Sequence, residues 1–533
     1  MKAVPPRMFS ALVADQKGRT TQRTCLSDSI NESSFPMGQC QSLPAILMQR
    51  LSGADRCAVR IAVWVLLAFP IAAAEMGAGT AHGAENNSRP NIVLIMADDL
   101  GYGDVSCYGG PHIPTPNIDS IAADGVRFTD GYVTAPVCSP SRAGLLTGRY
   151  QQRFGFEFNT GPRERDWQQG LGLPLEEITV ADLMRKAGYA TGMFGKWHQG
   201  LQPQFHPMNR GFDTFFGFRF GGTLYIDPAT PGVKSVQYDR RRIWPRRYEH
   251  DPIMRDRSPV EEHRYLTDAL SEEAAAFIRK HQQEPFFAYV PYNAPHTPLQ
   301  ATQKYVKRFA DVDDDRKQVY RAMTSALDDG VGLILKTLQD AGLAENTFVV
   351  FLSDNGGALY TGASENTPLR GGKLSLFEGG IRVVFAARWP AQLKKGQVYR
   401  HPVSSLDLLP TLLRAAGGSL PTNRPYDGVD LMPYLTGKES GRPHEILFWR
   451  NGDNAAVRKG DWKLWRTSDG HVWLYDLAND VGEENNLAEE RPEVVKQLQS
   501  ELDKWEKTLA EPKWPTRRKV PLKVDDVTVQ LSI

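Results

Sequence analysis

Residues 91–99 read NIVLIMADD, an apolar run from Ile92 to Met96 that ends in two adjacent aspartates. A short continuous apolar run is typical of a strand that is buried on both faces of a sheet. Three further segments, 189–194, 285–290 and 347–352, show the same pattern, and helix-like amphipathic segments lie at 176–187, 267–281 and 316–341. This alternation predicts an α/β domain with a large, mostly parallel sheet flanked by helices.

A polar cluster follows each of the four predicted strands. The clusters are Asp98-Asp99, Lys196-Trp197-His198, the segment 293–296 and Asp354-Asn355. In open α/β sheets, ligands bind beyond the carboxyl ends of the strands, so these clusters should converge on one crevice. Solvated polar loops would explain any single cluster, but four together favour an enzyme.

The pattern changes after Pro421. Short aromatic segments at 462–465 and 472–475 predict strands, and the amphipathic segment 492–509 predicts a helix. We therefore expect a catalytic domain at 90–420 and a smaller C-terminal subdomain at 421–533, built from an antiparallel sheet plus one helix.

Composition narrows the class of protein further. The 533 residues are 41% hydrophobic and carry 63 basic against 62 acidic side chains, as in an ordinary globular protein. This balance argues against a nucleic-acid partner. The five cysteines exclude a disulfide-stapled framework, because only Cys107 and Cys138 lie beyond the expected leader.

Residues 1–89 are expected to be a leader. The uncharged stretch 61–74 follows Arg50, Arg56 and Arg60 and precedes small residues, which is typical of a signal peptide. We expect translation to start at Met48, a signal peptide at about 48–83, and cleavage after 72–74 or 81–83. A buried helix is the alternative, and a membrane span would need ~20 apolar residues. The predicted location is periplasmic or secreted.

Two strand ends carry candidate metal ligands. Asp98, Asp99, Asp354 and Asn355 offer hard oxygen donors, which suit Ca²⁺ or Mg²⁺. Adjacent aspartates repel each other unless a cation lies between them. A turn or helix cap is the alternative for Asp98-Asp99 taken alone.

The segment 138–142, CSPSR, is the most specific element of the chain. Cys138 lies just ahead of a predicted helix, where backbone N–H groups favour anions, so it could be a low-pKa thiolate nucleophile. A disulfide with Cys107 is the other reading that the residues allow.

From about Arg89 onward, the chain resembles a type I sulfatase of the alkaline-phosphatase superfamily. Cys138-x-Pro140-x-Arg142 matches the signature in which the cysteine is oxidised to formylglycine. The further matching motifs are DDLGYG (98–103), TPN (115–117), LTGR (146–149), GKWH (195–198), PH (295–296), SDNG (353–356) and GGK (371–373). Gln199 departs from the apolar residue of many relatives, which bears on orientation or substrate fit and not on the mechanism.

The resemblance implies an alkaline-phosphatase-like fold and hydrolysis of a sulfate ester. It implies that Cys138 becomes a formylglycine gem-diol, made by a formylglycine-generating enzyme, and that Asp98, Asp99, Asp354 and Asn355 bind a metal together with the diol oxygen. One hydroxyl attacks sulfur and the other later expels sulfate. Asp354 acts as the base for the attacking hydroxyl.

The remaining roles that the resemblance implies belong to basic side chains. Arg142 and Lys196 hold the diol and its anion, His198 takes the second proton, Lys373 clamps the sulfate, and His296 is the candidate acid for the departing alcohol. Taken singly, each of these residues could be an ordinary surface or loop residue.

Two other functions fit the same motifs. A phosphate or phosphonate ester hydrolase of the superfamily would use the same nucleophile and metal. A non-catalytic sugar-binding relative would follow if Cys138 stayed unconverted.

The segment 238–248, YDRRRIWPRRY, suggests the substrate. Its five arginines could bind sulfate or carboxylate while its aromatic rings stack on sugars, which favours a sulfated polysaccharide or glycosaminoglycan fragment. A solvated hairpin whose arginines pair with nearby acids is the alternative.

Replacing Arg240, Arg242 and Arg246 by Ala should therefore raise KM for sulfated oligosaccharides by about 10-fold, because charged contacts are lost. Activity on a small aryl sulfate should stay unchanged. Steady-state kinetics on both substrates checks this, and equal losses on both would remove the segment from the recognition surface.

Overall fold

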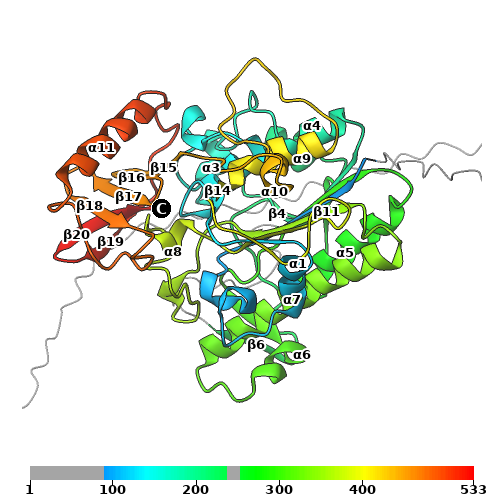
Figure 1. Ribbon diagram of the computed structural model, residues 1–533. Coiled ribbons are helices and arrows are strands. Elements are labelled where there is room, and N and C mark those ends of the chain that lie inside the picture. Colours follow the sequence, from blue (N-terminus) through cyan, green and yellow to red (C-terminus); the bar gives the residue numbers. More distant parts are fainter. Residues whose placement is uncertain (1–88, 237–251) are drawn as a thin grey trace, which may run out of the picture. The chain divides into compact units, whose positions relative to one another are not determined.

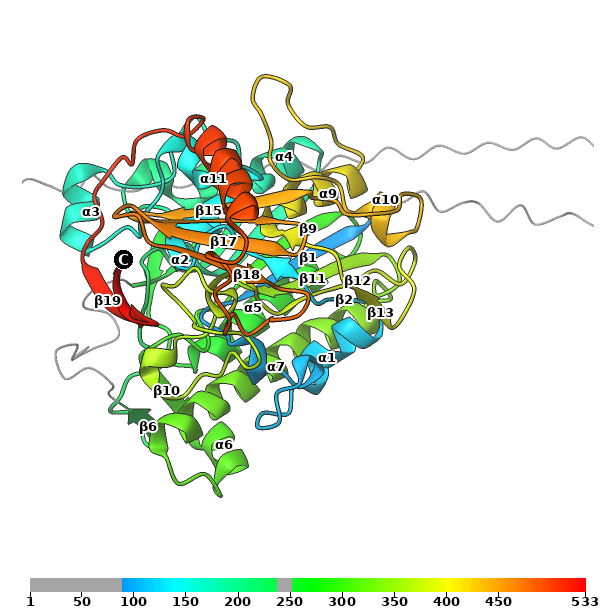
Figure 2. The same ribbon diagram turned by 60° about the vertical axis from the view of Figure 1, so that its left-hand side comes forward.

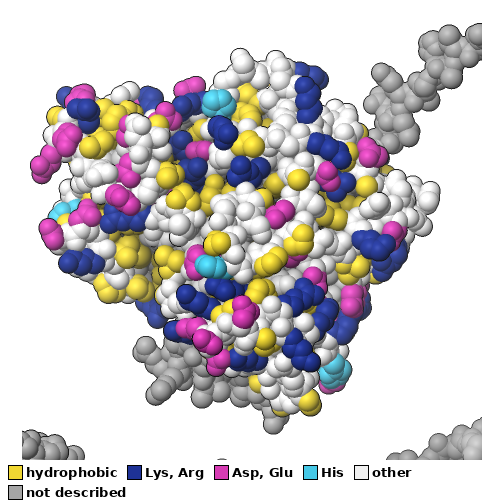
Figure 3. Space-filling model, turned by 60° about the horizontal axis from the view of Figure 1, so that its bottom comes forward, with side chains coloured by type: hydrophobic (Ala, Val, Ile, Leu, Met, Phe, Trp, Pro, Cys, Tyr) yellow, Lys and Arg dark blue, Asp and Glu magenta, His cyan; other side chains and the backbone are white. Residues whose placement is uncertain are grey.

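The computed structural model describes residues 89–236 and 252–533, which lie in one compact unit. The predicted signal peptide and the arginine-rich segment 238–248 lie outside the described residues, so both stay predictions. No helix in the described ranges is long and apolar enough to cross a bilayer. On the face drawn in Figure 3, basic and acidic side chains are interspersed.

A ten-stranded sheet forms the centre of the fold (Figure 1), with the strand order β13-β2-β12-β11-β1-β9-β4-β5-β7-β8. The five central strands are mutually parallel: β11 Thr347–Ser353, β1 Asn91–Ala97, β9 Phe286–Pro291, β4 Ala190–Lys196 and β5 Thr214–Phe218. The edges are β12 Phe385–Arg388, β2 Val126–Phe128 and β13 Gln397–Tyr399 on one side, and β7 Ile253–Arg255 and β8 Ser258–Val260 on the other. The predicted large, mostly parallel sheet is confirmed.

Both faces of the sheet are covered by helices. Val93 and Ile95 of β1 pack on the face of α1 Pro116–Ala123, α5 Leu266–Lys280 and α7 Asp315–Asp340 (Figure 1). Ile92 and Leu94 point to the opposite face, where they join α2 Cys138–Thr147, α4 Val180–Lys186 and α9 Leu408–Ala415. This burial on both sides explains the continuous apolar run in the sequence.

The predicted helices lie close to their expected positions, except at one start. The patterns at 267–281 and 316–341 correspond to α5 and α7. The helix expected at 176–187 begins only at Val180, because Thr179 and Asp182 form a capping box that fixes the helix start.

The small C-terminal sheet is antiparallel, as predicted. Its strands are β15 Ile446–Asn451, β16 Asn454–Lys459, β17 Trp462–Thr467 and β18 Val472–Asp476. The helix α11 Pro492–Glu506 packs on this sheet through Leu498 and Leu502 (Figure 2). A final hairpin, β19 Lys519–Val524 and β20 Val527–Ser532, was not expected from the sequence.

Shorter elements complete the described fold. They are α3 Arg163–Gln169, α6 Gln303–Val306, α8 Glu378–Ile381, α10 Met432–Leu435, the strand pair β3 Gly131–Tyr132 with β14 Val403–Ser404, and the pair β6 Val233–Val236 with β10 Leu299–Thr302.

A buried charge cluster joins the small sheet to the part of the chain that contains the large sheet. Lys463 of β17 lies 2.9 Å from Glu378 of α8 and 2.8 Å from Glu483, and all three side chains are fully buried. Burial raises the pKa of Glu483 to about 7, with Glu378 adding to the shift and Lys463 opposing it. The ammonium group therefore compensates two carboxyl groups that have no access to water.

Lys463→Met should destabilise the protein by about 3–5 kcal/mol, because it leaves the buried Glu483 without its cation, whereas Glu378 keeps its contact with Arg382. Urea unfolding measures this change. Lys459→Met is the matched control, since its partner Glu501 is solvent-accessible and such pairs contribute about 1 kcal/mol or less. Equal small changes in both variants would contradict the assigned role of the cluster.

Candidate active site

The four predicted polar clusters meet at one edge of the sheet. Their strands β11, β1, β9 and β4 are immediate neighbours, so their carboxyl ends lie side by side. The Asp354 amide donates to the Ala97 carbonyl at 3.1 Å, and the Asp98 amide donates to the Ala294 carbonyl at 3.0 Å. Asp99 adopts a left-handed conformation with φ 65°. The predicted convergence is confirmed.

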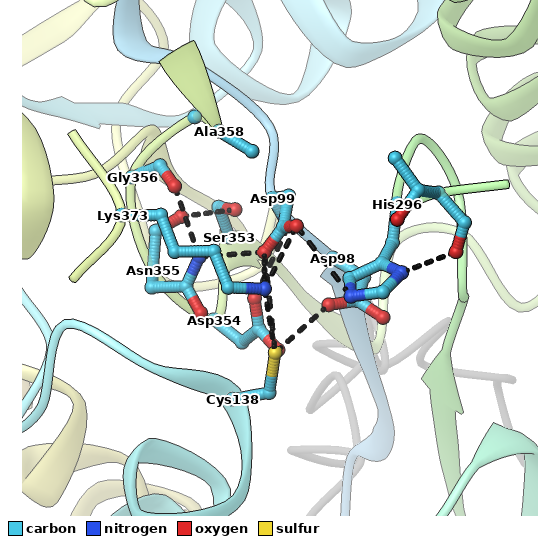
Figure 4. Close-up of polar contacts among 12 residues, drawn as sticks. Asp98, Asp99, Cys138, His296, Ser353, Asp354, Asn355, Gly356, Ala358 and Lys373 are labelled. Atoms are coloured by element: carbon cyan, nitrogen blue, oxygen red, sulfur yellow. Dashed lines mark hydrogen bonds and ion pairs between the residues drawn. The ribbon is translucent and has the colours of Figure 1, made fainter. Parts of the chain in front are cut away.

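Three buried carboxyl groups, those of Asp98, Asp99 and Asp354, lie together in the site (Figure 4). Each of them contacts a basic side chain. Lys196 Nζ lies 2.6 Å from Asp98 Oδ2, and Lys373 Nζ lies 2.6 Å from Asp99 Oδ1. Arg142 donates from Nε to Asp354 Oδ2 at 2.9 Å, and its Nη2 lies 2.8 Å from the same oxygen. The basic groups reduce the repulsion between carboxylates.

The electrostatic surroundings separate the acidities of two of these carboxyl groups. Burial acts to raise the pKa of Asp98, but Lys196, His296 and Arg142 hold it well below its usual range. Burial and the nearby Asp98 raise the pKa of Asp354 to about 6. Asp354 is therefore the more basic of the two.

Cys138 is the first residue of α2, directly after its N-cap Val137. Its Sγ lies 3.2 Å from Lys373 Nζ and 3.4 Å from Asp98 Oδ1 (Figure 4). Burial raises the pKa of the thiol, although Lys196 and Lys373 oppose the shift, so the thiolate interpretation gains no support. Cys107 and Cys138 are both free, so the disulfide interpretation is wrong.

Both predicted histidines line the pocket next to Cys138. Burial, with Lys196 and Arg142, lowers the pKa of His198 well below its usual value, and its Nδ1 has no hydrogen-bond partner within the described ranges. His296 Nδ1 lies 2.5 Å from the Thr297 carbonyl, and its Nε2 lies 3.6 Å from Asp99 Oδ2. Burial lowers the pKa of His296 to about 4.

The contacts of three polar residues beside Cys138 and His198 were not predicted from the sequence. Ser139 donates to the His198 carbonyl at 2.7 Å, and Gln199 donates to the Ser139 carbonyl at 2.8 Å. Gln199 therefore braces the backbone around His198. Asn159 Oδ1 accepts from the Ser139 amide at 2.9 Å. Ser139 lies in the CSPSR motif and Gln199 follows the GKWH motif, but only the structure shows what they contact. Asn159 belongs to no motif, so only its position identifies it.

A cavity of about 950 Å³ opens above Cys138. Its wall includes Phe220, Tyr360 and residues of the C-terminal segment, none of which was expected to face the site. Cys138, His198, His296 and Lys373 lie in the same cavity wall, so the predicted residues are brought together.

Comparisons with known proteins agree on one family. The family model "Sulfatase" matches residues 90–419, and "N-sulphoglucosamine sulphohydrolase, C-terminal" matches 372–508. Mus musculus N-acetylgalactosamine-6-sulfatase is 38% identical over 398 residues, covering 72% of each chain. Canis lupus familiaris arylsulfatase H is 36% identical over 456 residues, covering 70% of this chain and 79% of its own.

A solved structure extends the agreement to three dimensions. The crystal structure of Ps i-CgsB in complex with k-i-k-neocarrahexaose is 36% identical, with a TM-score of 0.73, and the match covers 80% of this chain and 95% of that chain. Because a family model matches more than half of the chain and the relatives are this similar, the protein belongs to the sulfatase family.

Proposed function

We propose that this sulfuric ester hydrolase cleaves a sulfate ester on a carbohydrate, with Cys138 converted to formylglycine and one bound Ca²⁺ ion. The observation that carries the proposal is the position of Cys138. It lies on the floor of a large cavity, with Lys373 and Asp98 within 3.4 Å of its Sγ. The hydrated aldehyde would supply the nucleophilic hydroxyl for attack on sulfur.

The donor set fits a hard divalent cation. Asp98, Asp99, Asp354 and Asn355 offer carboxylate and amide oxygens, and Asn355 Oδ1 is buried with no hydrogen-bond partner in the described part of the chain. An amide beside carboxylates favours Ca²⁺, which tolerates flexible coordination, over Mg²⁺. When bound, the ion would lower the pKa of the nucleophilic hydroxyl and polarise a sulfate oxygen.

One geometric detail bears on the choice of ligands. Ligand atoms of Asp98, Asp99, Cys138 and His296 lie within 4.8 Å of one another. Asn355 donates from Nδ2 to Asp99 Oδ1 at 2.8 Å, and the Asp99 backbone amide donates to Asp354 Oδ1 at 3.2 Å. These contacts hold Asp99, Asp354 and Asn355 together, so we assign the metal to the oxygen donors and not to His296. His296 Nε2 then stays available to the substrate.

The basic residues around Cys138 would stabilise the negative charges that form during the reaction. Lys196 and Lys373 are close enough to stabilise negative charge at position 138, since both oppose the burial that raises the pKa of Cys138. Arg142 holds Asp354, the proposed base for the attacking hydroxyl, through two contacts to Oδ2. We assign Lys373 to the sulfate, whose charge grows in the transition state, and Lys196 with Arg142 to the diol and its anion.

The two histidines would move protons at different stages. Neutral His198 would accept the proton of the second hydroxyl as sulfate is expelled. His296 would donate from Nε2 to the departing alcohol, because the short Nδ1 contact with the Thr297 carbonyl fixes its orientation. To donate this proton, His296 must be protonated. A bound anionic sulfate would raise the pKa of its imidazole and so oppose the effect of burial.

The relatives support a carbohydrate substrate. One is named an N-acetylgalactosamine-6-sulfatase, and a solved neighbour contains k-i-k-neocarrahexaose. We further propose that a formylglycine-generating enzyme acts on Cys138 and that the protein is exported to the periplasm or secreted.

Cys138→Ala should lower kcat/KM on an aryl sulfate by about 1,000-fold or more, because it removes the nucleophile. Cys107→Ala is the matched control, since Cys107 lies outside the cavity wall and should keep the wild-type rate. An aryl phosphate serves as the second substrate. Wild-type rates in Cys138→Ala, or a preference for phosphate, would contradict the proposal.

Elemental analysis of the purified protein should give one Ca²⁺ per chain, and Asp354→Asn should lose both the metal and the activity. Asp329→Asn is the control, because Asp329 pairs with Arg308 on the protein surface. Stoichiometric zinc, or full activity in Asp354→Asn, would overturn the metal assignment.

A further inference from the structure

The cavity above Cys138 extends well beyond the space that one sulfate group requires. Its volume of about 950 Å³ lies at the upper end of the range for small-molecule sites, about 300–1,000 Å³. Cys138, His198, His296 and Lys373 form one part of its wall. Other parts come from residues 159–164, 220–224 and 297–300 and from the C-terminal segment.

The charges in this remaining wall are predominantly positive. Arg163 of α3 and Arg517 and Arg518 of the C-terminal segment line the cavity, and Glu164 is the one acidic side chain among the described lining residues. Arg517 and Arg518 are exposed and Arg163 is half-buried, so a ligand can reach them. Guanidinium groups bind sulfate and carboxylate through two parallel hydrogen bonds.

Arg517 lies on the side of the cavity near Phe220. Gly161 has φ 107°, and a Cβ there would lie 3.1 Å from Arg517 Nη1 and 3.7 Å from Phe220 Cε2. The Phe220 ring lies 6.3 Å from the His198 ring, measured between centroids. One aromatic ring therefore connects the arginine side of the cavity to the catalytic histidine.

The backbone after Phe220 passes close to both histidines. A Cβ at Gly221 would lie 2.7 Å from His198 Nε2, and one at Gly222 would lie 3.7 Å from His296 Cε1. These glycines let the loop pass close to the imidazoles, while Phe220 presents an apolar ring at the cavity wall. Such a ring is suited to contact the face of a sugar.

We propose that Arg163, Arg517 and Arg518 form a second anion subsite, which binds a sulfate or carboxylate group on the sugar next to the one that carries the cleaved ester. This inference rests on the proposed function and makes it more specific. The preferred substrate is a polyanionic oligosaccharide, and a saccharide with a single sulfate leaves the subsite empty.

The test compares three oligosaccharides with the same scissile sulfate ester: one with no further charge, one with a second sulfate and one with a carboxylate on the neighbouring sugar. Wild-type protein should show a higher kcat/KM for the two dianionic substrates, by about 10- to 100-fold, because hydrogen bonds between charged groups are strong. The difference between the second sulfate and the carboxylate identifies which group the subsite prefers.

The double variant R163A/R518A should lose this preference and keep the wild-type rate on an aryl sulfate. Lys519→Ala is the matched control, because Lys519 lies in β19 next to Arg518 but pairs with Asp453 and does not line the cavity. It should keep the preference. An equal loss on all substrates, or a wild-type protein without preference, would overturn the subsite.

A binding measurement separates this inference from the proposed chemistry. Isothermal titration of the Cys138→Ala protein with the uncharged-neighbour and disulfated oligosaccharides needs no turnover. The subsite is supported if the disulfated ligand binds more tightly than the other and if adding R163A/R518A to the Cys138→Ala protein removes this difference. This conclusion holds even if the wild-type protein hydrolyses neither oligosaccharide. Equal affinities contradict the subsite, even if the wild-type protein proves to be an active sulfatase.

Discussion

The arrangement of the site depends on one electrostatic constraint: three carboxyl groups are buried side by side where parallel strands end. Asp98, Asp99 and Asp354 are almost completely inaccessible to water, so their charges must be compensated within the protein. Lys196, Arg142 and Lys373 supply the positive charge from three separate segments of the chain. The three positive charges match the three carboxylates within one small volume, and the oxygen donors of the proposed metal site belong to the same cluster.

The fold meets this constraint through the order of its strands. Because β11, β1, β9 and β4 are parallel neighbours, their carboxyl ends deliver Asp354, Asp98 and Lys196 to the same edge. Lys373 reaches the site from the loop before α8, and Glu378 of α8 is held in turn by Lys463 of the small sheet. The C-terminal part thus supports the loop that carries Lys373 and also contributes Arg517 and Arg518 to the cavity wall.

Sequence reasoning succeeded where local patterns determine the structure. The apolar runs located four of the five central strands within about two residues, and the polar clusters after them located the site. It failed where partners are distant in sequence: the pairing of β19 with β20 and the approach of Arg517 to Gly161 depend on tertiary packing. Likewise, the position of Cys138 followed from its motif, whereas burial among carboxylates, which raises the pKa of its thiol, became visible only in three dimensions.

The central claim is that the charged site is built around a Cys138 that has been oxidised to formylglycine. The most direct test is the mass of the peptide that contains Cys138, taken from a purified sample whose sulfatase activity has been measured. The account predicts that active protein carries the aldehyde at this position and that the peptide reacts with a carbonyl-directed probe. A fully active sample in which every such peptide retains an unmodified cysteine would contradict it.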